Sequence, residues 1–279
     1  MRVLAALAAV PLLFAAGSFV EEEQRWRAAY EYSLTAPDGW LSVAGLFWLH
    51  EGANSAGSDP HSDVRLPAGA PVHAGMFRLE RGGVSWLPAH GATVPMQPDT
   101  SDRPTVVTIG DLSLTAIRRA DKIGIRLRDP NALARRSFKG AAWFPPEPSW
   151  VVKAKWIALQ KPKKIPITNI LGMTEDEDCP GYAEWKRDGK TWRLEPVLEG
   201  NLLFFMFKDA TNAHTTYGAG RFLYAEAPSN GEVILDFNHA HNPPCAFTAY
   251  ATCPLPPPQN RVDITVTAGE KIYARHPAQ

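Results

Sequence analysis

The residue types that could perform chemistry are concentrated in residues 236–261. The first seven positions of this segment hold an acid, two amides and two imidazoles: Asp236, Asn238, His239, His241 and Asn242. Burying so many polar groups is costly unless each finds a hydrogen-bonding partner. A proline-rich stretch follows that also holds Tyr250 and Asn260, and prolines restrict a loop to few conformations. We expect the segment to form a concave polar mouth.

The two histidines are candidate metal ligands. On an extended strand, side chains alternate between two faces, so His239 and His241 would share one face. Two neutral imidazoles placed in this way can bind one metal ion, but a complete site needs further ligands. The candidates are Glu232, Glu270 and His214, if the fold brings them close. Surface histidines are the alternative interpretation, and we predict no bound organic cofactor.

Three cysteines, Cys179, Cys245 and Cys253, allow other chemistry. Cys245 could act as a nucleophile, with one of the two histidines as its base and Asp236 or Asn238 to orient that base. Alternatively, Cys245 and Cys253 could close a small disulfide-bonded loop, which would leave Cys179 unpaired. Free buried thiols are the third interpretation, and the sequence leaves all three open.

Arg221 is the other side chain that we single out. It follows Gly218-Ala219-Gly220, whose small side chains let the backbone bend or pack closely. We expect Arg221 to pair with Asp236 from a neighbouring strand, either as a clamp for an anionic ligand or as a structural buried ion pair. The predicted ligand-binding set is therefore Arg221, Asp236, Asn238, Asn242, Tyr250 and Asn260.

Composition and charge exclude some classes of protein. The chain has 279 residues, with 29 Lys and Arg balanced by 29 Asp and Glu. A nucleic-acid-binding protein normally carries a basic excess, so we predict no nucleic-acid partner. The 25 prolines disfavour a helical bundle, because each removes a backbone donor and breaks an interior helical turn.

The first residues have the pattern of a secretory signal peptide. An early Arg2 precedes an apolar run, and Ala15 and Gly17 suit cleavage before Ser18. The run is shorter than the roughly 20 apolar residues of a transmembrane helix. We expect a signal peptide over residues 1–17, and a secreted or periplasmic protein with no membrane span after its removal. An uncleaved membrane anchor is the alternative.

The elements that must position these side chains are mostly strands. Residues 21–32 predict a helix that ends before Pro37. Three pairs of apolar runs flank turn signals and predict hairpins: 76–79 with 84–87, 105–109 with 112–117, and 182–187 with 191–194. Further strands are predicted at 40–49, 123–128, 150–159, 201–208, 221–226, 232–237 and 262–267. The run 201–208 is continuously apolar, which suits a strand buried on both faces.

Such closely spaced turns indicate sandwiches or barrels. We therefore predict an all-β fold of two packed β-sandwich- or barrel-like halves with a short N-terminal helix. The proline-rich residues 143–148 suggest a boundary. The predicted domains are residues 18–140 and 141–279.

Several phrases of the sequence resemble one family. They occupy residues 38–49, 138–140, 143–145, 216–223, 235–238, 242–248 and 250–261. Together they resemble the family called domain of unknown function 1684, from about residue 22 to the C-terminus. The resemblance implies no activity. Where the family commonly reads Asn-basic-Ala-Tyr-Asn, this chain has Asn238-His-Ala-His-Asn242, so it assigns no family-wide role to the two histidines.

The first half also resembles forkhead-associated domains, which bind phosphopeptides. The resemblance lies in residues 57–60, 63–67 and 73–74. Those domains bind phosphothreonine through an Arg and a Ser, but the corresponding positions here are Ser58 and Ala70. Phosphate then lacks its bidentate guanidinium partner. We expect a forkhead-like scaffold that does not bind phosphopeptides.

Three functions remain open. We expect an exported protein that binds a small molecule or a glycan in the polar mouth of its C-terminal half. The first alternative is a hydrolase or metal-dependent enzyme with His241 or Cys245 as the reactive group. The second is a structural or interaction module of the cell envelope, whose polar segment packs between the two halves. The sequence does not indicate the oligomeric state.

Overall fold

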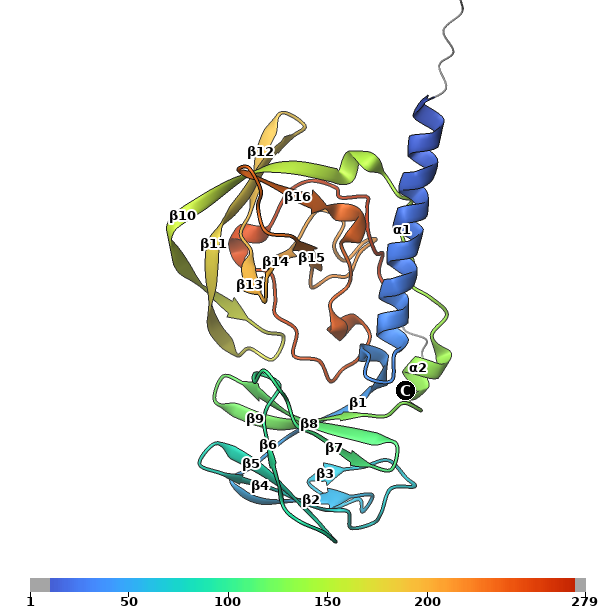
Figure 1. The fold of residues 1–279 in the computed structure, drawn as a ribbon, viewed down its shortest axis with the longest axis vertical. Helices are drawn as coiled ribbons and strands as arrows, with labels where there is room; N and C mark the ends of the chain where they lie inside the picture. The colour runs from blue at the N-terminus through green and yellow to red at the C-terminus, as the bar shows by residue number, and fades with distance from the viewer. Residues whose placement is uncertain (1–10, 274–279) are drawn as a thin grey trace, which may run out of the picture.

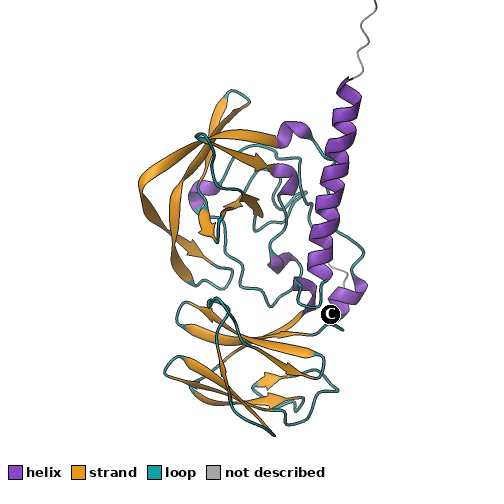
Figure 2. Ribbon diagram, viewed as in Figure 1, coloured by secondary structure: helices purple, strands orange, loops and turns teal. Residues whose placement is uncertain are grey.

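The computed structural model describes residues 11–273, as one long helix and a series of strands in four sheets (Figures 1 and 2). The strands form two groups, which span residues 43–128 and 151–236. This arrangement confirms the predicted all-β class with an N-terminal helix. Residues 1–10, most of the predicted signal peptide, lie outside the described residues.

The first group is a sandwich of two sheets, the lower body in Figure 1. One sheet has the order β1 (Val43–Trp48), β9 (Lys122–Arg128), β8 (Leu112–Arg119), β7 (Val106–Ile109). The other has the order β3 (Val64–Arg65), β2 (Gly52–Gly57), β4 (Gly75–Glu80), β5 (Gly83–Pro88), β6 (Val94–Met96). Both sheets contribute to one apolar core, for example through Phe77 and Leu114. The predicted hairpin β4–β5 forms because Arg81 and Gly82 adopt positive φ angles of 50° and 76° at its turn.

The second group also contains two sheets. One has the order β12 (Lys190–Leu194), β11 (Thr174–Arg187), β10 (Val151–Thr168), β16 (Glu232–Asp236). The other has the order β13 (Val197–Glu199), β14 (Leu202–Phe207), β15 (Arg221–Ala225). Leu203, Phe205 and Phe207 of β14 pack into the core between the sheets, whereas Phe204 and Met206 pack into a second cluster. β14 is therefore buried on both faces, as its apolar sequence predicts.

The end of the chain is irregular. Residues 237–260 contain three short 3-10 turns: η3 (Phe237–His239), η4 (Pro244–Ala246) and η5 (Pro258–Asn260). The predicted strand 262–267 is wrong, although Val262, Ile264 and Val266 are buried alternately. Its backbone makes isolated hydrogen bonds to residues 208 and 210 and no ladder among the described strands. Alternation predicted the burial of these side chains correctly, but burial does not require strand pairing.

Helix α1 (Pro11–Thr35) is longer than the predicted helix and ends before Pro37, as expected. It runs along the second group of strands in Figure 1. Its Tyr30 hydroxyl donates to Glu270 at 3.2 Å, and its Glu31 accepts from the Trp143 indole at 2.9 Å. Helix α1 thus belongs to the first predicted domain but contacts residues of the second. The predicted domain boundary at residue 140 stays a prediction. Over the described residues, no helix combines the length and apolarity needed to cross a membrane.

Candidate functional site

A pocket of about 530 Å³ opens where the two groups of strands and helix α1 meet. Its wall is mostly apolar, and the aromatic residues in it are Tyr30, Trp40, Phe204, Phe222, Tyr224 and Phe247. Six other polar side chains also line it: Ser33, Arg119, Glu199, His241, Asn242 and Thr252. Pockets of this size and character are typical of small-molecule sites.

The strand pair β14–β15 builds the aromatic wall. Phe204 and Tyr224 are register partners, and their rings stack with centroids 4.7 Å apart. Phe222 lies two residues before Tyr224 and therefore faces the same side of the sheet. Its ring meets Phe204 edge-on at 4.8 Å. Alternation along two short strands thus directs three rings into the pocket and leaves the neighbouring positions for the core.

His241 forms an isolated bridge to Phe222, with a backbone hydrogen bond of 2.9 Å in each direction. Its Nδ1 lies 3.0 Å from the carbonyl oxygen of His239. A carbonyl can only accept, so Nδ1 carries the proton and Nε2 presents a lone pair. Nε2 makes no hydrogen bond within residues 11–273. Burial among the aromatic rings lowers the pKa of His241 to about 4, and the imidazole is neutral at pH 7.

Asn242 supplies a second acceptor. Its Nδ2 donates to the Lys271 carbonyl at 2.8 Å, which defines the orientation of the amide. Its Oδ1 is buried and has no partner in the described part of the chain. Its backbone N–H donates to Glu270 at 2.7 Å, and burial raises the pKa of Glu270 to about 7. His241 and Asn242 are thus neighbours in the pocket wall, and each has one acceptor atom with no hydrogen bond among the described residues.

The charged residues at the pocket are already paired. The Arg119 guanidinium forms an ion pair with Asp99 at 2.8 Å, and its Nε donates to Thr252 at 2.9 Å. On the opposite sheet, the Tyr224 hydroxyl donates to Glu199 at 2.9 Å. Burial raises the pKa of Tyr224, so its hydroxyl keeps its proton. The rim thus joins side chains from both groups of strands.

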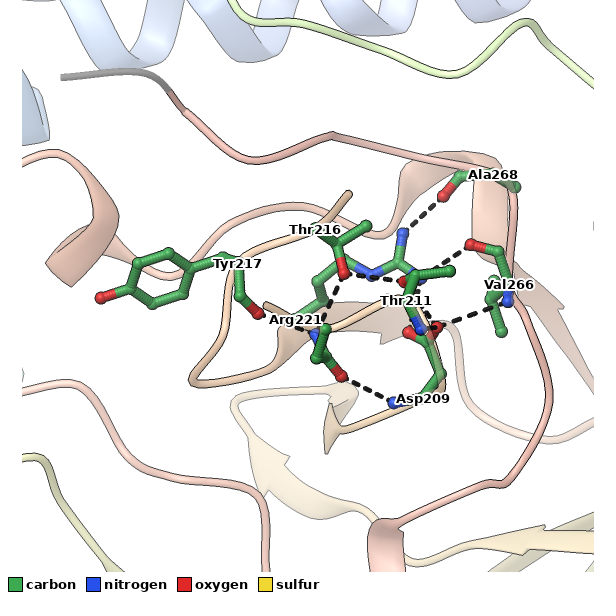
Figure 3. Close-up of polar contacts among 8 residues, drawn as sticks. Asp209, Thr211, Thr216, Tyr217, Arg221, Val266 and Ala268 are labelled. Atoms are coloured by element: carbon green, nitrogen blue, oxygen red, sulfur yellow. Dashed lines mark hydrogen bonds and ion pairs between the residues drawn. The ribbon is translucent and has the colours of Figure 1, made fainter. Parts of the chain in front are cut away.

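The sequence predicted that Arg221 pairs with Asp236, and this prediction is wrong. It is fully buried and forms an ion pair with Asp209 at 2.7 Å (Figure 3). Its guanidinium also donates to the carbonyls of Val266 and Ala268, at 3.1 and 2.5 Å. Asp236 lies in another sheet, at the end of β16, where it pairs in register with Val151 of β10. Arg221 therefore forms a structural buried ion pair with Asp209, and it does not line the pocket.

Most of the other predicted ligand-binding residues hold the backbone in place. Asn238 is fully buried and bonds to the backbone N–H and carbonyl of Glu147. Asn260 is equally buried and binds the backbone of Glu195 and Met206. Tyr250 is 42% exposed and lies outside the pocket wall. Of the predicted ligand-binding set, the pocket wall contains Asn242 alone.

The predicted pairing of His239 and His241 on one face of a strand is wrong. Residues 237–239 form a 3-10 turn because Asp236 caps it, accepting a hydrogen bond from the Asn238 N–H. The turn ends the alternation between faces. The His239 ring stacks on Trp26 of α1, with centroids 4.0 Å apart, whereas His241 lines the pocket.

The three cysteines are buried, and they form no disulfide with one another. The Cys245 backbone N–H donates to the Sγ of Cys253 at 3.0 Å. The neighbouring Cys245 and burial together raise the pKa of the Cys253 thiol, which keeps it protonated. A protonated thiol is a poor nucleophile. Catalysis by Cys245 stays a prediction.

Sequence reasoning missed most of the aromatic wall. The alternation of Phe222 and Tyr224 was a usable signal, because both follow Arg221 on a predicted strand. Nothing local linked Tyr30 or Trp40 to the segment around His241. Helix α1 and the 3-10 turn η1 (Trp40–Ser42) bring these two residues there from far away in the sequence.

Comparison with known proteins finds a family match for the C-terminal half. The family model described as Protein of unknown function (DUF1684) matches residues 136–271. Among solved structures, the chain is similar to the solution structure of an uncharacterized protein from Haloarcula marismortui, gene locus rrnAC0354. The two share 30% sequence identity over 49% of this chain and 78% of that chain, with a TM-score of 0.42. No curated protein matches the chain.

The matched residues include β10 to β16 and most of the pocket wall, whereas the sandwich of residues 43–128 lies before them. The resemblance of that sandwich to forkhead-associated domains stays a prediction. The family model covers the whole second group of strands, and the chain belongs to the DUF1684 family.

Proposed function

We propose that the protein binds a small molecule with a planar, mostly apolar body and at least one hydroxyl or amine group. The body would pack between the aromatic rings of β14, β15 and α1. The hydroxyl or amine would donate to Nε2 of His241 or to Oδ1 of Asn242. The observation that carries this proposal is the unpartnered, buried Oδ1 of Asn242 in the wall of an aromatic pocket.

The energetic argument rests on that acceptor. A buried polar atom without a partner costs about 1–3 kcal/mol. Since Oδ1 of Asn242 cannot turn away without losing its Nδ2 bond to Lys271, a ligand donor is the way to recover this cost. Aromatic side chains add contact area with a preferred geometry, because stacked and edge-on ring pairs are favourable.

The same features favour a compact aromatic alcohol or amine over a glycan. A sugar presents hydroxyls all around its ring and needs many polar partners. The pocket wall is mostly apolar, and its charged residues Arg119 and Glu199 already have partners. Use of His241 as a general base in a hydrolase stays a prediction.

We also propose that the protein is exported after removal of residues 1–17. Glu23, Trp26 and Tyr30, which connect α1 to the body through an ion pair, a ring stack and a hydrogen bond, all lie after the expected cleavage site. Mass spectrometry of the protein from its own cells tests this. A mature chain beginning near Ser18 outside the cytoplasm supports export, and an intact chain inside the cytoplasm refutes it.

The binding proposal is tested with simple probes. Tyramine and phenol carry a planar ring with a donor, toluene lacks the donor, and methyl β-glucoside has donors without an aromatic ring. Calorimetry should give saturable binding of tyramine or phenol, with toluene at least tenfold weaker because Asn242 and His241 stay unpaired. Tighter binding of the glucoside would replace the proposal with glycan recognition.

A blocking variant locates the binding site. Ser33 is exposed on α1 and lines the pocket, so Ser33→Trp should fill its opening without disturbing the core. Tyr32→Trp is the matched control, because Tyr32 is 76% exposed on the same helix and does not line the pocket. Loss of tyramine binding in Ser33→Trp alone is expected. Unchanged binding in Ser33→Trp, or no binding by the wild type, would refute the proposal.

A further inference from the structure

A second cluster of polar side chains lies outside the pocket, where α1 crosses the end of β16. Glu23 comes from the helix, Asp236 ends the strand, and His239 ends the turn η3. One ligand atom from each lies within 4.8 Å of the others. The Nε2 of His239 is 3.1 Å from a carboxylate oxygen of Glu23 and 3.8 Å from one of Asp236.

Two of the three side chains are oriented by neighbours. Asp236 accepts hydrogen bonds at Oδ1 from the backbone N–H and the side-chain amide of Asn238, both at 2.9 Å. These bonds leave Oδ2 directed at His239. The His239 ring stacks on Trp26 at 4.0 Å with an interplanar angle of 6°, which holds its plane. Metal ligands are commonly oriented by such outer partners.

Glu23 provides an independent sign of a missing partner. The residue is only 3% exposed, and its Oε2 has no hydrogen bond within the described residues. A buried carboxylate oxygen without a partner is costly, and a cation is one group that removes the cost. The other oxygen, Oε1, contacts His239. Glu23 is thus a buried acid directed into the cluster from a different element of the chain.

We propose that Glu23, Asp236 and His239 bind a divalent transition-metal ion such as Zn²⁺. Ligand atoms around tetrahedral zinc, with bonds of about 2.0–2.1 Å, lie about 3.3 Å apart. The observed separations of 3.1 and 3.8 Å lie on either side of this value, so only small shifts of the side chains are required. Two carboxylates and an imidazole are a donor set that zinc accepts, and three protein ligands leave one position for water. The side chains of His239 and Asp236 are 30% and 20% exposed, so an ion can reach them.

Arg27 is the charged neighbour that this site must accommodate. It lies one turn after Glu23, and its charge acts on Glu23 and Asp236. Its guanidinium packs over the Trp143 ring at 5.0 Å, and its Nε and Nη2 have no hydrogen bond partner among the described residues. Arg27 therefore lowers the negative charge of the cluster without occupying the three ligand atoms. The ion pair of protonated His239 with Glu23 is the competing arrangement.

A metal ion here would join α1 to the body of the C-terminal half. Helix and turn already meet through the stack of Trp26 on His239. The ion would add coordinate bonds from Glu23 on one side to Asp236 and His239 on the other. The buried Asn238 would then have two functions: its amide binds the Glu147 carbonyl, and it also orients the Asp236 carboxylate toward the ion.

Zinc titration of the metal-free full chain tests the proposal. Calorimetry or competition with a chelating dye should give one tight equivalent. Glu23→Gln and His239→Phe should each weaken binding about tenfold or more, because each removes a ligand while keeping the shape of the side chain. Glu22→Gln is the matched control, because Glu22 is exposed one position away on the same helix. Circular dichroism melts of the metal-free variants report whether they still fold.

A charge variant distinguishes the metal site from a simple ion pair. Arg27→Met removes the repelling charge and should tighten zinc binding severalfold, whereas an ion pair of Glu23 with His239 gives no such gain. Absence of saturable zinc binding by the wild type would overturn the proposal. So would equal zinc affinity in Glu23→Gln, His239→Phe and the wild type, because the ion would then bind elsewhere.

Discussion

The two halves of the molecule hold their backbones in different ways. The sandwich of residues 43–128 is made of paired strands around an apolar core. The C-terminal half interrupts its strands with long irregular segments. Most of the buried polar side chains belong to that half: Asn169, Asp209, Thr211, Thr216, Arg221, Asn238, Asn242, Thr248, Thr252, Asn260 and Glu270.

This difference indicates that the buried polar residues of the C-terminal half mainly provide hydrogen bonds to irregular backbone. Irregular backbone that is buried needs partners other than a ladder. Arg221, Asn238 and Asn260 provide them by bonding to carbonyls and N–H groups of distant segments. A dense polar sequence therefore indicated an internal scaffold more than a binding surface. Asn242 is the exception, since one of its polar atoms remains without a partner.

The largest predicted effect comes from breaking the buried ion pair. Arg221→Met leaves the Asp209 carboxylate buried without its partner and should lower the free energy of unfolding by about 3–5 kcal/mol. Arg78→Met is the control in the first half, because Arg78 pairs with Glu80 at the surface. Its cost should stay below about 1 kcal/mol. Urea unfolding followed by tryptophan fluorescence measures both, and equal losses would remove the contrast between the halves.

The next effect depends on pH. Burial raises the pKa of Glu270 to about 7, with Tyr30, Glu31 and Arg221 as its charged or titratable neighbours. The folded state then binds the proton more tightly than the unfolded state. The resulting stabilisation is complete below the ordinary glutamate pKa near 4.3 and is lost as pH rises through about 7.

Glu270→Gln isolates this contribution, because glutamine imitates the protonated acid. Wild type and variant should have similar stability at pH 5, and the variant should be more stable at pH 8 by on the order of 3 kcal/mol. Thermal unfolding at several pH values gives the difference. A constant difference between pH 5 and 8 would mean that Glu270 does not titrate in this range.

The smallest effect compares two buried asparagines. Asn260 ties η5 to Glu195 and Met206. Asn54 in the first half binds mainly the nearby backbone of His50 and Gly52, and its bond to the more distant Phe77 carbonyl is long, at 3.4 Å. Asn260→Ala should cost about 2 kcal/mol and Asn54→Ala about 1 kcal/mol, because removing Asn260 leaves more distant backbone groups unpaired. Denaturant unfolding measures both costs. A larger cost for Asn54→Ala would mean that local turns of the sandwich depend on polar side chains as much as the C-terminal half does.

The sequence predicted most of the fold because its hairpin signals are local. Alternating apolar residues and the turn at Arg81-Gly82 are enough to define β4 and β5. The same reasoning failed at residues 236–242, where the short turn capped by Asp236 replaced an extended strand. It failed in a different way at 262–267, where alternation marks side chains buried beside an unpaired backbone.

The pocket could be predicted only in part. His241 and Asn242 were identified from their residue types, which local sequence reveals. The rings that complete the wall come from α1, from residue 40 and from β14 and β15, and only the folded chain brings them together. Arg221 was singled out for its neighbours in sequence, but its partner Asp209 lies outside the segment that sequence reasoning considered.

Arg119, at the pocket rim, connects the two halves of the molecule. Its guanidinium holds Asp99 of the first half and Thr252 of the second at the same time. Because the pocket wall takes residues from both halves, a ligand that fills the pocket would contact both of them. Binding of such a ligand and the angle between the halves would then be linked reciprocally.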